Sequence, residues 1–301
     1  MEDFEGKVAV ITGTANPRGI GLAIATQLAE LGCRLVLADI DGAGVTARAG
    51  ELEAAGRQVL PVRTDMGDRS SVEELARVTY DHYGATHILV LNHVAPTGDP
   101  GHSLLAPDPT SWELHARVNL LGVVYGIKAF AHRMMAGGEH GHILATTSGA
   151  GATGTMYGNG PYACTKAAIT SVMECLYGQL RDAGADIVPS LIFPGVTDTF
   201  PSPEAGPMVV EMLRQNGAMV VLSPPSEVAA FTIDAIRRDM FWANPDVETD
   251  RRLTGGRHAE TISWTKEIYQ RRANALIERT PPDPYLWGPP SSYLERSPRN
   301  Q

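Results

Sequence analysis

Short apolar runs alternate along the chain with longer stretches in which apolar residues recur every three or four positions. The first run, at 7–12, reads "KVAVIT", and four of its six residues are Val, Ile or Thr, which favour a β-strand. The stretch at 19–32 places Ile20, Ile24 and Leu28 on one face of an amphipathic helix. The same pattern predicts further strands at 34–39, 58–65, 87–92, 142–148, 187–195 and 240–244. It predicts further helices at 42–56, 69–83, 110–135, 160–183, 204–216 and 225–238.

The order of these elements indicates the fold class. Strands that alternate with helices pair in parallel through right-handed crossovers. Strands that are apolar throughout need a cover on both faces of their sheet. We therefore expect an α/β fold, a doubly wound parallel sheet of about seven strands, built from residues 1–245. Residues 246–301 follow as a C-terminal extension with a possible amphipathic helix at 258–278.

The composition narrows the class of protein. A chain of 301 residues that is 43% hydrophobic and 20% charged can bury a core. Its net charge of -9, with no block of like charges, argues against nucleic-acid binding. No apolar run approaches the roughly 20 residues of a membrane span, and the N-terminus lacks a signal-peptide core, so we expect a cytoplasmic protein. The three cysteines match no zinc pattern, so we expect reduced thiols and no metal.

The turn between the first strand and the first helix is rich in glycine and reads "ITGTANPRGIG". Gly13, Gly19 and Gly21 let the backbone approach a ligand closely, and the helix N-terminus offers unpaired N–H groups and a partial positive charge. In a doubly wound sheet, this turn lies beyond the carboxyl end of the first strand, where dinucleotides bind. The turn therefore predicts a phosphate site.

Two charged residues near the turn bear on the choice of dinucleotide. Asp39 ends the second strand, where a carboxylate can bind both hydroxyls of an adenosine ribose and repels a 2′-phosphate. Asp39 therefore favours NAD over NADP, although it could instead cap the next helix, a role that Asp41 can fill. Arg18 favours NADP if it pairs with a 2′-phosphate, and is neutral on the question if it is a solvated loop charge.

The most informative chemical pattern is "YACTKAA" at 162–168, on a predicted helix. Tyr162 and Lys166 are four residues apart and therefore share a face. A phenol with a pKa near 10 is a poor base at neutral pH, but a nearby ammonium and a cationic nicotinamide ring both lower its pKa. Ser148 ends the fifth strand and can hold a substrate oxygen beside Tyr162. Asn119, unusual inside a helix, can bind a water that relays protons.

In order and spacing, the motifs resemble those of the short-chain dehydrogenase/reductase family over about residues 5–245: "TGTANPRGIG", Asp39, "TDMGD", Asn119, Ser148, "YACTK" and "FPGVTDT". The resemblance implies a Rossmann-type fold and reversible hydride transfer between a nicotinamide cofactor and an alcohol or ketone. It also implies a catalytic tetrad, composed of Asn119, Ser148, Tyr162 and Lys166.

The same resemblance implies which residues bind the cofactor. Asp65 and Met66 contact the adenine, Thr197 and Thr199 hold the carboxamide end, and Lys166 binds the nicotinamide ribose. The whole expected set is Gly13, Arg18, Gly19, Ile20, Gly21, Asp39, Asp65, Met66, Asn92, Tyr162, Lys166, Pro194, Thr197 and Thr199.

The chain departs from the family pattern in two spacings. Five residues separate Gly13 from Gly19, where most members have three. The enoyl-reductase branch shares this longer turn, but it places its tyrosine seven residues before its lysine. Because that position is Asn159 here, the enoyl interpretation fails. Ser148 and Tyr162 are fourteen residues apart rather than the commoner thirteen.

Two residues are expected in the substrate pocket. His93 follows Asn92 in "LNHV", where the family usually has Asn-Asn-Ala-Gly, and is interpreted as a wall residue or a second acid/base. Tyr157 lies nine residues before Lys166 in a stretch that would border the substrate, with a packed surface tyrosine as the alternative.

The Ser–Tyr spacing and the long C-terminal segment are similar to those of bacterial dehydrogenases that oxidise benzylic alcohols of lignin-derived aryl ethers. This narrower resemblance implies a bulky aromatic or polycyclic secondary alcohol or ketone, with residues 246–301 on the substrate side or in a subunit interface. Family members commonly form homodimers or homotetramers through two long helices, here 110–135 and 160–183. The alternatives are an NADPH-dependent biosynthetic ketoreductase and a non-catalytic nucleotide-sensing or scaffold protein.

Overall fold

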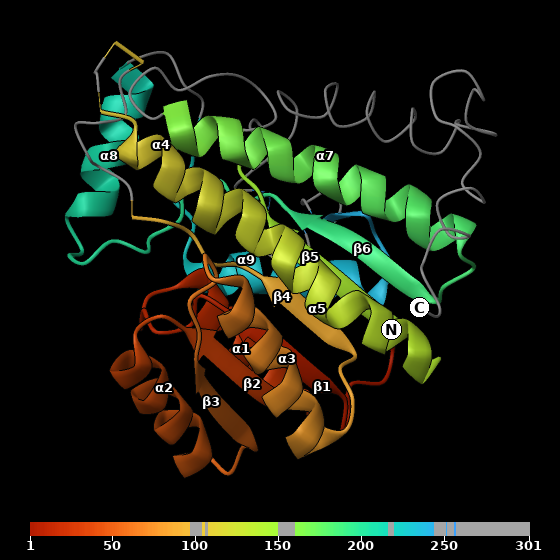
Figure 1. Cartoon of the computed structure of the whole chain (residues 1–301). Helices are drawn as coiled ribbons and strands as arrows, with labels where there is room; N and C mark the ends of the chain where they lie inside the picture. The colour runs from red at the N-terminus through yellow and green to blue at the C-terminus, as the bar shows by residue number, and fades with distance from the viewer. Residues whose placement is uncertain are drawn as a thin grey trace, which may run out of the picture.

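The computed structural model describes residues 1–96, 104–105, 108–149, 160–215 and 220–243, with the single residues 251 and 256. Within these ranges the chain forms a seven-stranded sheet in the order β3-β2-β1-β4-β5-β6-β7 (Figure 1). All six neighbouring pairs are parallel, which confirms the predicted fold class. The strands are β1 Val8–Thr12, β2 Arg34–Asp39, β3 Val59–Arg63, β4 Ile88–Leu91, β5 Gly141–Thr146, β6 Ile187–Ile192 and β7 Trp242–Ala243.

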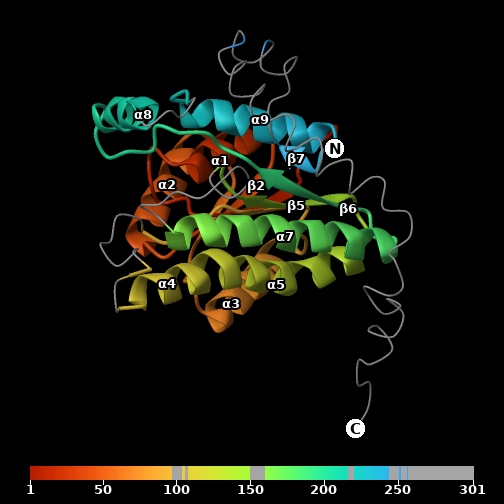
Figure 2. The same ribbon diagram turned by 90° about the horizontal axis from the view of Figure 1, so that it is seen from above.

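Helices cover both faces of the sheet, as Figure 2 shows in a view along its edge. One layer contains α1 Ile20–Glu30, α2 Gly42–Ala54 and α9 Pro225–Arg237, and α8 Ala205–Gln215 lies at the same side of the molecule. The other layer contains α3 Arg69–Tyr83, α4 Thr110–His115, the π-helical segment η2 Ala116–Leu121, α5 Gly122–Gly137 and α7 Gly160–Asp182.

Two apolar cores explain why the strands are hydrophobic throughout. Successive strand residues point to opposite faces. In β1, Ala9 and Ile11 therefore pack into the core under α1 and α9, whereas Val10 packs into the core under α5 and α7. All three side chains are fully buried. Burial of a Val or Ile side chain contributes about 1.5–3 kcal/mol, so both faces contribute to stability.

The strand order reverses at β1, which has β2 on one side and β4 on the other. At such a point the loops after neighbouring strands diverge and leave a crevice beyond the carboxyl ends. Residues expected in the site lie at this edge of the sheet. Asp39 is the last residue of β2, and the others follow the ends of their strands: Gly13 after β1, Asn92 after β4, Ser148 after β5 and Pro194 after β6.

The long helix expected at 110–135 differs from the prediction in one respect. The segment η2 interrupts it between α4 and α5 with wider π-type turns, and it contains Asn119. Single π-helical turns within α-helices are rare and often occur at functional sites. The helix expected at 258–278 and the expected boundary at residue 245 lie outside the described residues. None of the helices in the described ranges has the length and apolar character needed to cross a bilayer.

Candidate active site

Asn119 is fully buried and its side chain connects two separate segments. Its Oδ1 accepts a hydrogen bond from the backbone N–H of Ala95, after β4, at 2.7 Å. Its Nδ2 donates to Oγ1 of Thr165, on α7, at 3.1 Å. Asn119 thus links the loop after β4 to the helix that carries Tyr162 and Lys166.

Tyr162 and Lys166 lie on one face of α7, as their spacing predicts. The Lys166 Nζ lies 5.6 Å from the centre of the Tyr162 ring. Lys166 is almost fully buried, with 2% exposed, and its Nζ donates to the backbone carbonyl of Thr146 at 2.7 Å. Burial lowers the pKa of Lys166 to about 8. An ammonium has three donors, and within the described part of the chain one of them is used, in the bond to Thr146.

The Tyr162 hydroxyl forms a hydrogen bond with Ser148, which brings together the two residues expected to hold the substrate oxygen. Burial raises the pKa of Tyr162 above its ordinary value near 10, and the Ser148 hydrogen bond lowers it by less. The expected lowering of this pKa requires Lys166 together with the positive charge of bound NAD⁺, and it stays a prediction for the cofactor complex. Burial opposes it, because burial disfavours the charged forms of both Tyr162 and Lys166.

A threonine that the sequence reading missed ties three parts of the site together. Thr146 ends β5, and its Oγ1 donates to Oδ1 of Asn92 at 2.9 Å. The Nδ2 of Asn92 in turn lies 3.5 Å from the carbonyl oxygen of Gly13. Because the Thr146 carbonyl accepts from Lys166, the glycine turn, the end of β4 and α7 share one network. The repeated threonine in "ATTS" was the only sequence signal for it.

Two glycines of the turn leave no room for a side chain at their positions. Gly13 has φ +74°, and a Cβ there would lie 3.0 Å from the Cα of His93. A Cβ on Gly21 would lie 2.4 Å from the carbonyl oxygen of Gly13. Gly19 is the N-cap of α1 and makes no side-chain capping bond, so among the described residues no cap side chain occupies the N–H groups of the first helical turn, which can bind a ligand. This backbone cradle fits an anionic pyrophosphate.

Asp39 connects the glycine turn to the start of α2. Its Oδ2 accepts from the N–H of Ala15 at 2.9 Å, and its Oδ1 accepts from the N–H of Asp41 at 3.1 Å. Asp41 is the N-cap of α2 and accepts from the N–H of Gly44. The capping role therefore belongs to Asp41, and the Asp39 carboxylate lies beside the turn at the end of β2.

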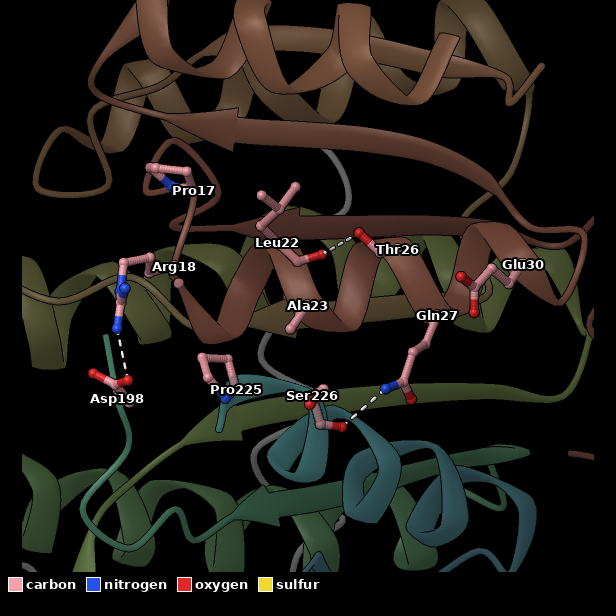
Figure 3. Close-up of a pocket in the computed structure, with 11 residues that line it drawn as sticks. Pro17, Arg18, Leu22, Ala23, Thr26, Gln27, Glu30, Asp198, Pro225 and Ser226 are labelled. Atoms are coloured by element: carbon pink, nitrogen blue, oxygen red, sulfur yellow. Dashed lines mark hydrogen bonds and ion pairs between the residues drawn. The ribbon is translucent and has the colours of Figure 1, made fainter. Parts of the chain in front are cut away.

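The extra residues of the glycine turn contact the segment after β6. Nη2 of Arg18 lies 2.6 Å from Oδ2 of Asp198 (Figure 3). Nδ2 of Asn16 donates to the carbonyl of Thr199 at 3.2 Å. Arg18 is expected near the cofactor's ribose or pyrophosphate, which stays a prediction, and in the structure its guanidinium is paired with Asp198. Arg18 and Asp198 border a cavity of about 450 Å³ between α1 and the start of α9, and no member of the tetrad lines it.

The other expected cofactor contacts lie in the loops at the same edge of the sheet. Oδ1 of Asp65 accepts from the N–H of Gly67 at 2.8 Å, and Met66 is buried beside this turn. Thr197 is buried, and its hydroxyl donates to the carbonyl of Gly195 at 3.1 Å. Partly buried residues complete the set: Ile20, Pro194 and Thr199.

His93 is buried and both of its ring nitrogens are engaged. Nδ1 lies 2.9 Å from Oγ1 of Thr12, and Nε2 lies 3.1 Å from the carbonyl oxygen of Val118. Because a carbonyl only accepts, Nε2 carries the proton and Nδ1 accepts from Thr12. Burial lowers the pKa of His93 to about 3. Both ring nitrogens are engaged, which disfavours the second acid/base role; the role of a wall residue in the substrate pocket needs no free nitrogen and stays a prediction. Tyr157 lies outside the described residues.

Comparison with known proteins identifies relatives of this chain. Residues 7–210 match the family model described as short chain dehydrogenase. The chain is 33% identical over 241 residues to 1-deoxy-11-beta-hydroxypentalenate dehydrogenase of Streptomyces exfoliatus, covering 79% of this chain and 82% of that one. It is 31% identical over 243 residues to (2S)-[(R)-hydroxy(phenyl)methyl]succinyl-CoA dehydrogenase subunit BbsD of Thauera aromatica, covering 81% and 91%.

Solved structures share the fold. A short chain dehydrogenase/reductase from Burkholderia phymatum in complex with NAD superposes with a TM-score of 0.71 at 30% identity, covering 94% of this chain and 99% of that one. A short chain dehydrogenase from Burkholderia cenocepacia in complex with NADP superposes with a TM-score of 0.70 at 25% identity, covering 80% and 96%.

Proposed function

This chain belongs to the short-chain dehydrogenase family and is an oxidoreductase of hydroxyl- or carbonyl-bearing small molecules; we propose that it uses NAD(H) and acts on a bulky secondary alcohol or ketone. The observation that carries the proposal is the arrangement of Tyr162, whose hydroxyl bonds Ser148 and whose ring lies 5.6 Å from the Nζ of Lys166. Members that only sense nucleotides would have no need of this arrangement.

The cofactor would lie across the carboxyl ends of the strands. The open N–H groups of α1 would bind the pyrophosphate, Asp39 the adenosine ribose, and Lys166 the nicotinamide ribose. When bound, NAD supplies the hydride acceptor, and NADH the donor. The residues proposed to hold it are Gly13, Arg18, Gly19, Ile20, Gly21, Asp39, Asp65, Met66, Asn92, Tyr162, Lys166, Pro194, Thr197 and Thr199.

The residues of the tetrad would divide the work of proton transfer. Tyr162 would take the proton from a substrate hydroxyl or return it to a carbonyl oxygen, and Ser148 would orient that oxygen. Burial favours the neutral phenol, so in alcohol oxidation Lys166 and the positive charge of the bound cofactor must together favour the phenolate. Asn119 would act as a positioning residue because it bonds Thr165 rather than the reacting atoms.

Two charged residues support NAD over NADP. Asp39 presents a carboxylate where the adenosine ribose would lie, and a carboxylate repels a 2′-phosphate. Arg18, the nearby cation that could offset this repulsion, is paired with Asp198 at 2.6 Å. The alternative function is an NADPH-dependent ketoreductase, and the structural relative in complex with NADP supports this alternative.

The substrate class is proposed from two observations. The spacing of Ser148 and Tyr162 adds one residue to the loop that would border the substrate. The BbsD relative carries in its name a hydroxyl on a phenyl-bearing carbon, which is a benzylic secondary alcohol. We also propose a homodimer or homotetramer through the α4–α5 and α7 helices, and a cytoplasmic location.

A spectrophotometric screen tests the proposal. Purified chain would be mixed with NAD⁺ and a panel of aryl and polycyclic secondary alcohols, and with NADH and the matching ketones, while absorbance is followed at 340 nm. Activity on benzylic or polycyclic members, with NADH bound more tightly than NADPH, is the expected result. A tighter NADPH complex would contradict the cofactor assignment, and the lack of any turnover across the panel would contradict the substrate class.

A further inference from the structure

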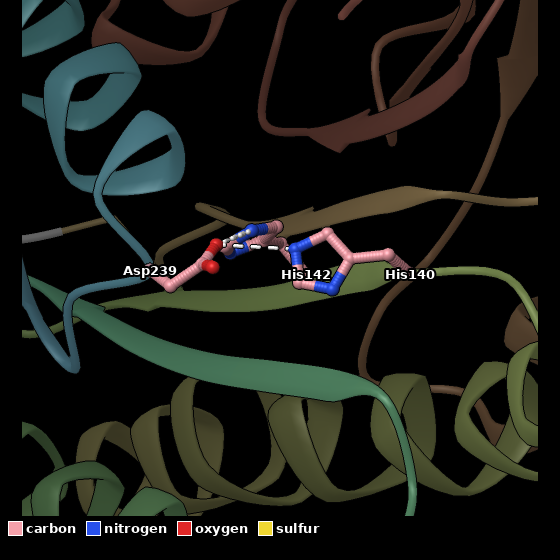
Figure 4. Close-up of side chains that lie close together, drawn as sticks. All are labelled: His140, His142 and Asp239. Atoms are coloured by element: carbon pink, nitrogen blue, oxygen red, sulfur yellow. Dashed lines mark hydrogen bonds and ion pairs between the residues drawn. The ribbon is translucent and has the colours of Figure 1, made fainter. Parts of the chain in front are cut away.

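Two histidines and an aspartate converge at the end of the sheet opposite the proposed active site. His140 and His142 flank Gly141, the first residue of β5, and their side chains lie on the same side because alternate strand residues do. Nε2 of His140 and Nε2 of His142 each lie 3.1 Å from the same atom, Oδ1 of Asp239 (Figure 4). Asp239 follows the end of α9.

We propose that His140, His142 and Asp239 bind one divalent transition-metal ion of the zinc class. The three candidate ligand atoms lie within 4.8 Å of one another. Zinc bound tetrahedrally at about 2.0–2.1 Å from each ligand separates its ligand atoms by about 3.4 Å. Both histidine–carboxylate separations are already close to that value. Two imidazoles and a carboxylate form a donor set that suits Zn²⁺ and its neighbours rather than Mg²⁺ or Ca²⁺.

The surroundings of His140 have the features of a metal ligand. Its other nitrogen, Nδ1, lies 2.7 Å from Oδ1 of Asp186. A carboxylate on the second nitrogen of a ligating histidine fixes the ring orientation and makes the ligand more basic. The carboxylates of Asp186 and Asp239 together also match the charge of a divalent ion.

Access and rigidity favour the same role. His142 is fully buried, while the side chains of His140 and Asp239 are 30% and 47% exposed, so one side of the cluster is open to solvent. Water can therefore supply the remaining ligand. Asp239 has φ +52°, a left-handed conformation uncommon for residues other than glycine. The backbone holds it there, because the N–H of Met240 donates to the carbonyl of Ala235 at 2.9 Å.

Two features of the cluster affect its affinity for a metal ion. The N-terminal ammonium of Met1 lies 3.0 Å from Oδ1 of Asp239 and competes with a cation for that oxygen. It also donates to the carbonyl of Ile236 at 3.0 Å, which gives it a second partner when the oxygen binds a metal. Nδ1 of His142 has no hydrogen-bond partner among the described residues, and it would take the ring proton when Nε2 binds the ion.

The site would be structural. β5 runs six residues from this cluster to Thr146, and at about 3.3 Å per residue the two ends are roughly 16 Å apart. A metal here would connect the start of β5 to the end of α9 and stabilise the folded chain without touching the tetrad.

Metal titration of the tag-free 301-residue chain tests the proposal. After treatment with EDTA and its removal, ZnCl₂ would be titrated by calorimetry, and CoCl₂ by visible absorbance. We expect one ion per chain and a rise in Tm with Zn²⁺, because a ligand of the folded state stabilises it. His140→Asn and Asp239→Asn should each weaken binding by about tenfold or more, and circular dichroism would confirm that both variants fold.

Two control variants separate this site from adventitious binding. His132→Asn removes an exposed histidine of α5, and the double variant Cys164→Ser/Cys175→Ser removes the exposed thiols. Both should bind Zn²⁺ as the wild type does. The proposal is overturned if the wild type binds no stoichiometric Zn²⁺, or if His140→Asn and Asp239→Asn retain wild-type affinity. It is equally overturned if the cysteine variant loses the ion.

Discussion

The amide Nδ2 of Asn119 lies 3.1 Å from Oγ1 of Thr165, the residue directly before Lys166. The π-helical segment η2 carries Asn119, and α7 carries Thr165. The other end of the Asn119 side chain holds the N–H of Ala95 at 2.7 Å. One buried amide thus sets the position of α7 relative to the loop after β4, and with it the positions of Tyr162 and Lys166.

Removal of this amide should affect both stability and turnover. Asn119→Ala leaves the buried N–H of Ala95 unpaired, which costs about 1–3 kcal/mol. Because α7 loses its tether, we also expect kcat to fall by up to about 10²-fold. Thr165→Val is a companion variant: it breaks the bond to Asn119 and keeps the bond to Ala95, but it also leaves the buried Asn119 amide unpaired, so it should be destabilised as well. Urea unfolding and steady-state rates measure both effects, and an Asn119→Ala chain as stable and as active as the wild type would contradict the account.

The carboxylate of Asp39 should set the cofactor preference. Asp39→Asn removes the charge that repels a 2′-phosphate, so the ratio of the Kd for NADPH to the Kd for NADH should fall by about tenfold or more. Asp41→Asn is the matched control, because Asp41 caps α2 and asparagine caps equally well. Fluorescence titration of both cofactors measures the ratio. An unchanged ratio in Asp39→Asn would contradict the role of Asp39 in the preference for NADH over NADPH.

Arg18 should have little part in that preference. Its guanidinium is paired with Asp198, and both side chains are partly exposed, so the pair contributes about 0.2–1 kcal/mol. A double-mutant cycle of Arg18→Ala and Asp198→Ala should return a coupling energy in that range. Arg18→Ala should change the Kd for NADH and NADPH by the same factor. A selective loss of NADPH affinity would show instead that Arg18 reaches a 2′-phosphate.

Stability should fall in mild acid because of His93. Its pKa is lowered to about 3 in the folded chain, against about 6.5 when unfolded. Below pH 6.5, His93 therefore binds a proton in the unfolded chain but not in the folded chain, and the free energy of unfolding falls as pH decreases toward 3. This amounts to about 2 kcal/mol between pH 6.5 and pH 5.

The His93 contribution can be isolated with a variant. Urea unfolding of His93→Gln at pH 7, 6 and 5 should show a shallower loss of stability with acid than the wild type shows. His132→Gln removes an exposed histidine and should follow the wild type. Parallel curves for His93→Gln and the wild type would mean that His93 accepts a proton in the folded chain.

Local periodicity was sufficient to predict most of the fold and the central pair of the site. The seven strands follow from short apolar runs, their parallel pairing follows from their alternation with helices, and the shared face of Tyr162 and Lys166 follows from a spacing of four residues. The strand ends were less predictable: within the described residues the last strand begins at Trp242, where its pairing with β6 begins, rather than at 240, and residue 244 lies outside the described ranges.

What the sequence left out depends on contacts between distant segments. Arg18 and Asp198 are 180 residues apart, and the partners of Asn119 and His93 also come from other elements. Burial of Tyr162, which no local pattern reveals, raises its pKa and opposes the expected effect of Lys166 and a bound cofactor. The expectation of no metal rested on cysteine spacing; the contact of "HGH" at 140–142 with Asp239 joins residues that lie 97 positions apart in the case of His142, and no local pattern shows it.

The central claim is that Tyr162 transfers the substrate proton, and Tyr162→Phe tests it most directly. Phenylalanine keeps the ring and removes the hydroxyl, and Tyr177→Phe makes the same change elsewhere on α7. Rates at 340 nm with an alcohol found in the screen would be compared with the Kd for NADH. The account predicts that Tyr162→Phe loses about 10²–10⁴-fold in kcat while NADH binding and the Tyr177→Phe rate stay close to wild type. Retention of more than about a tenth of wild-type kcat by Tyr162→Phe would contradict it.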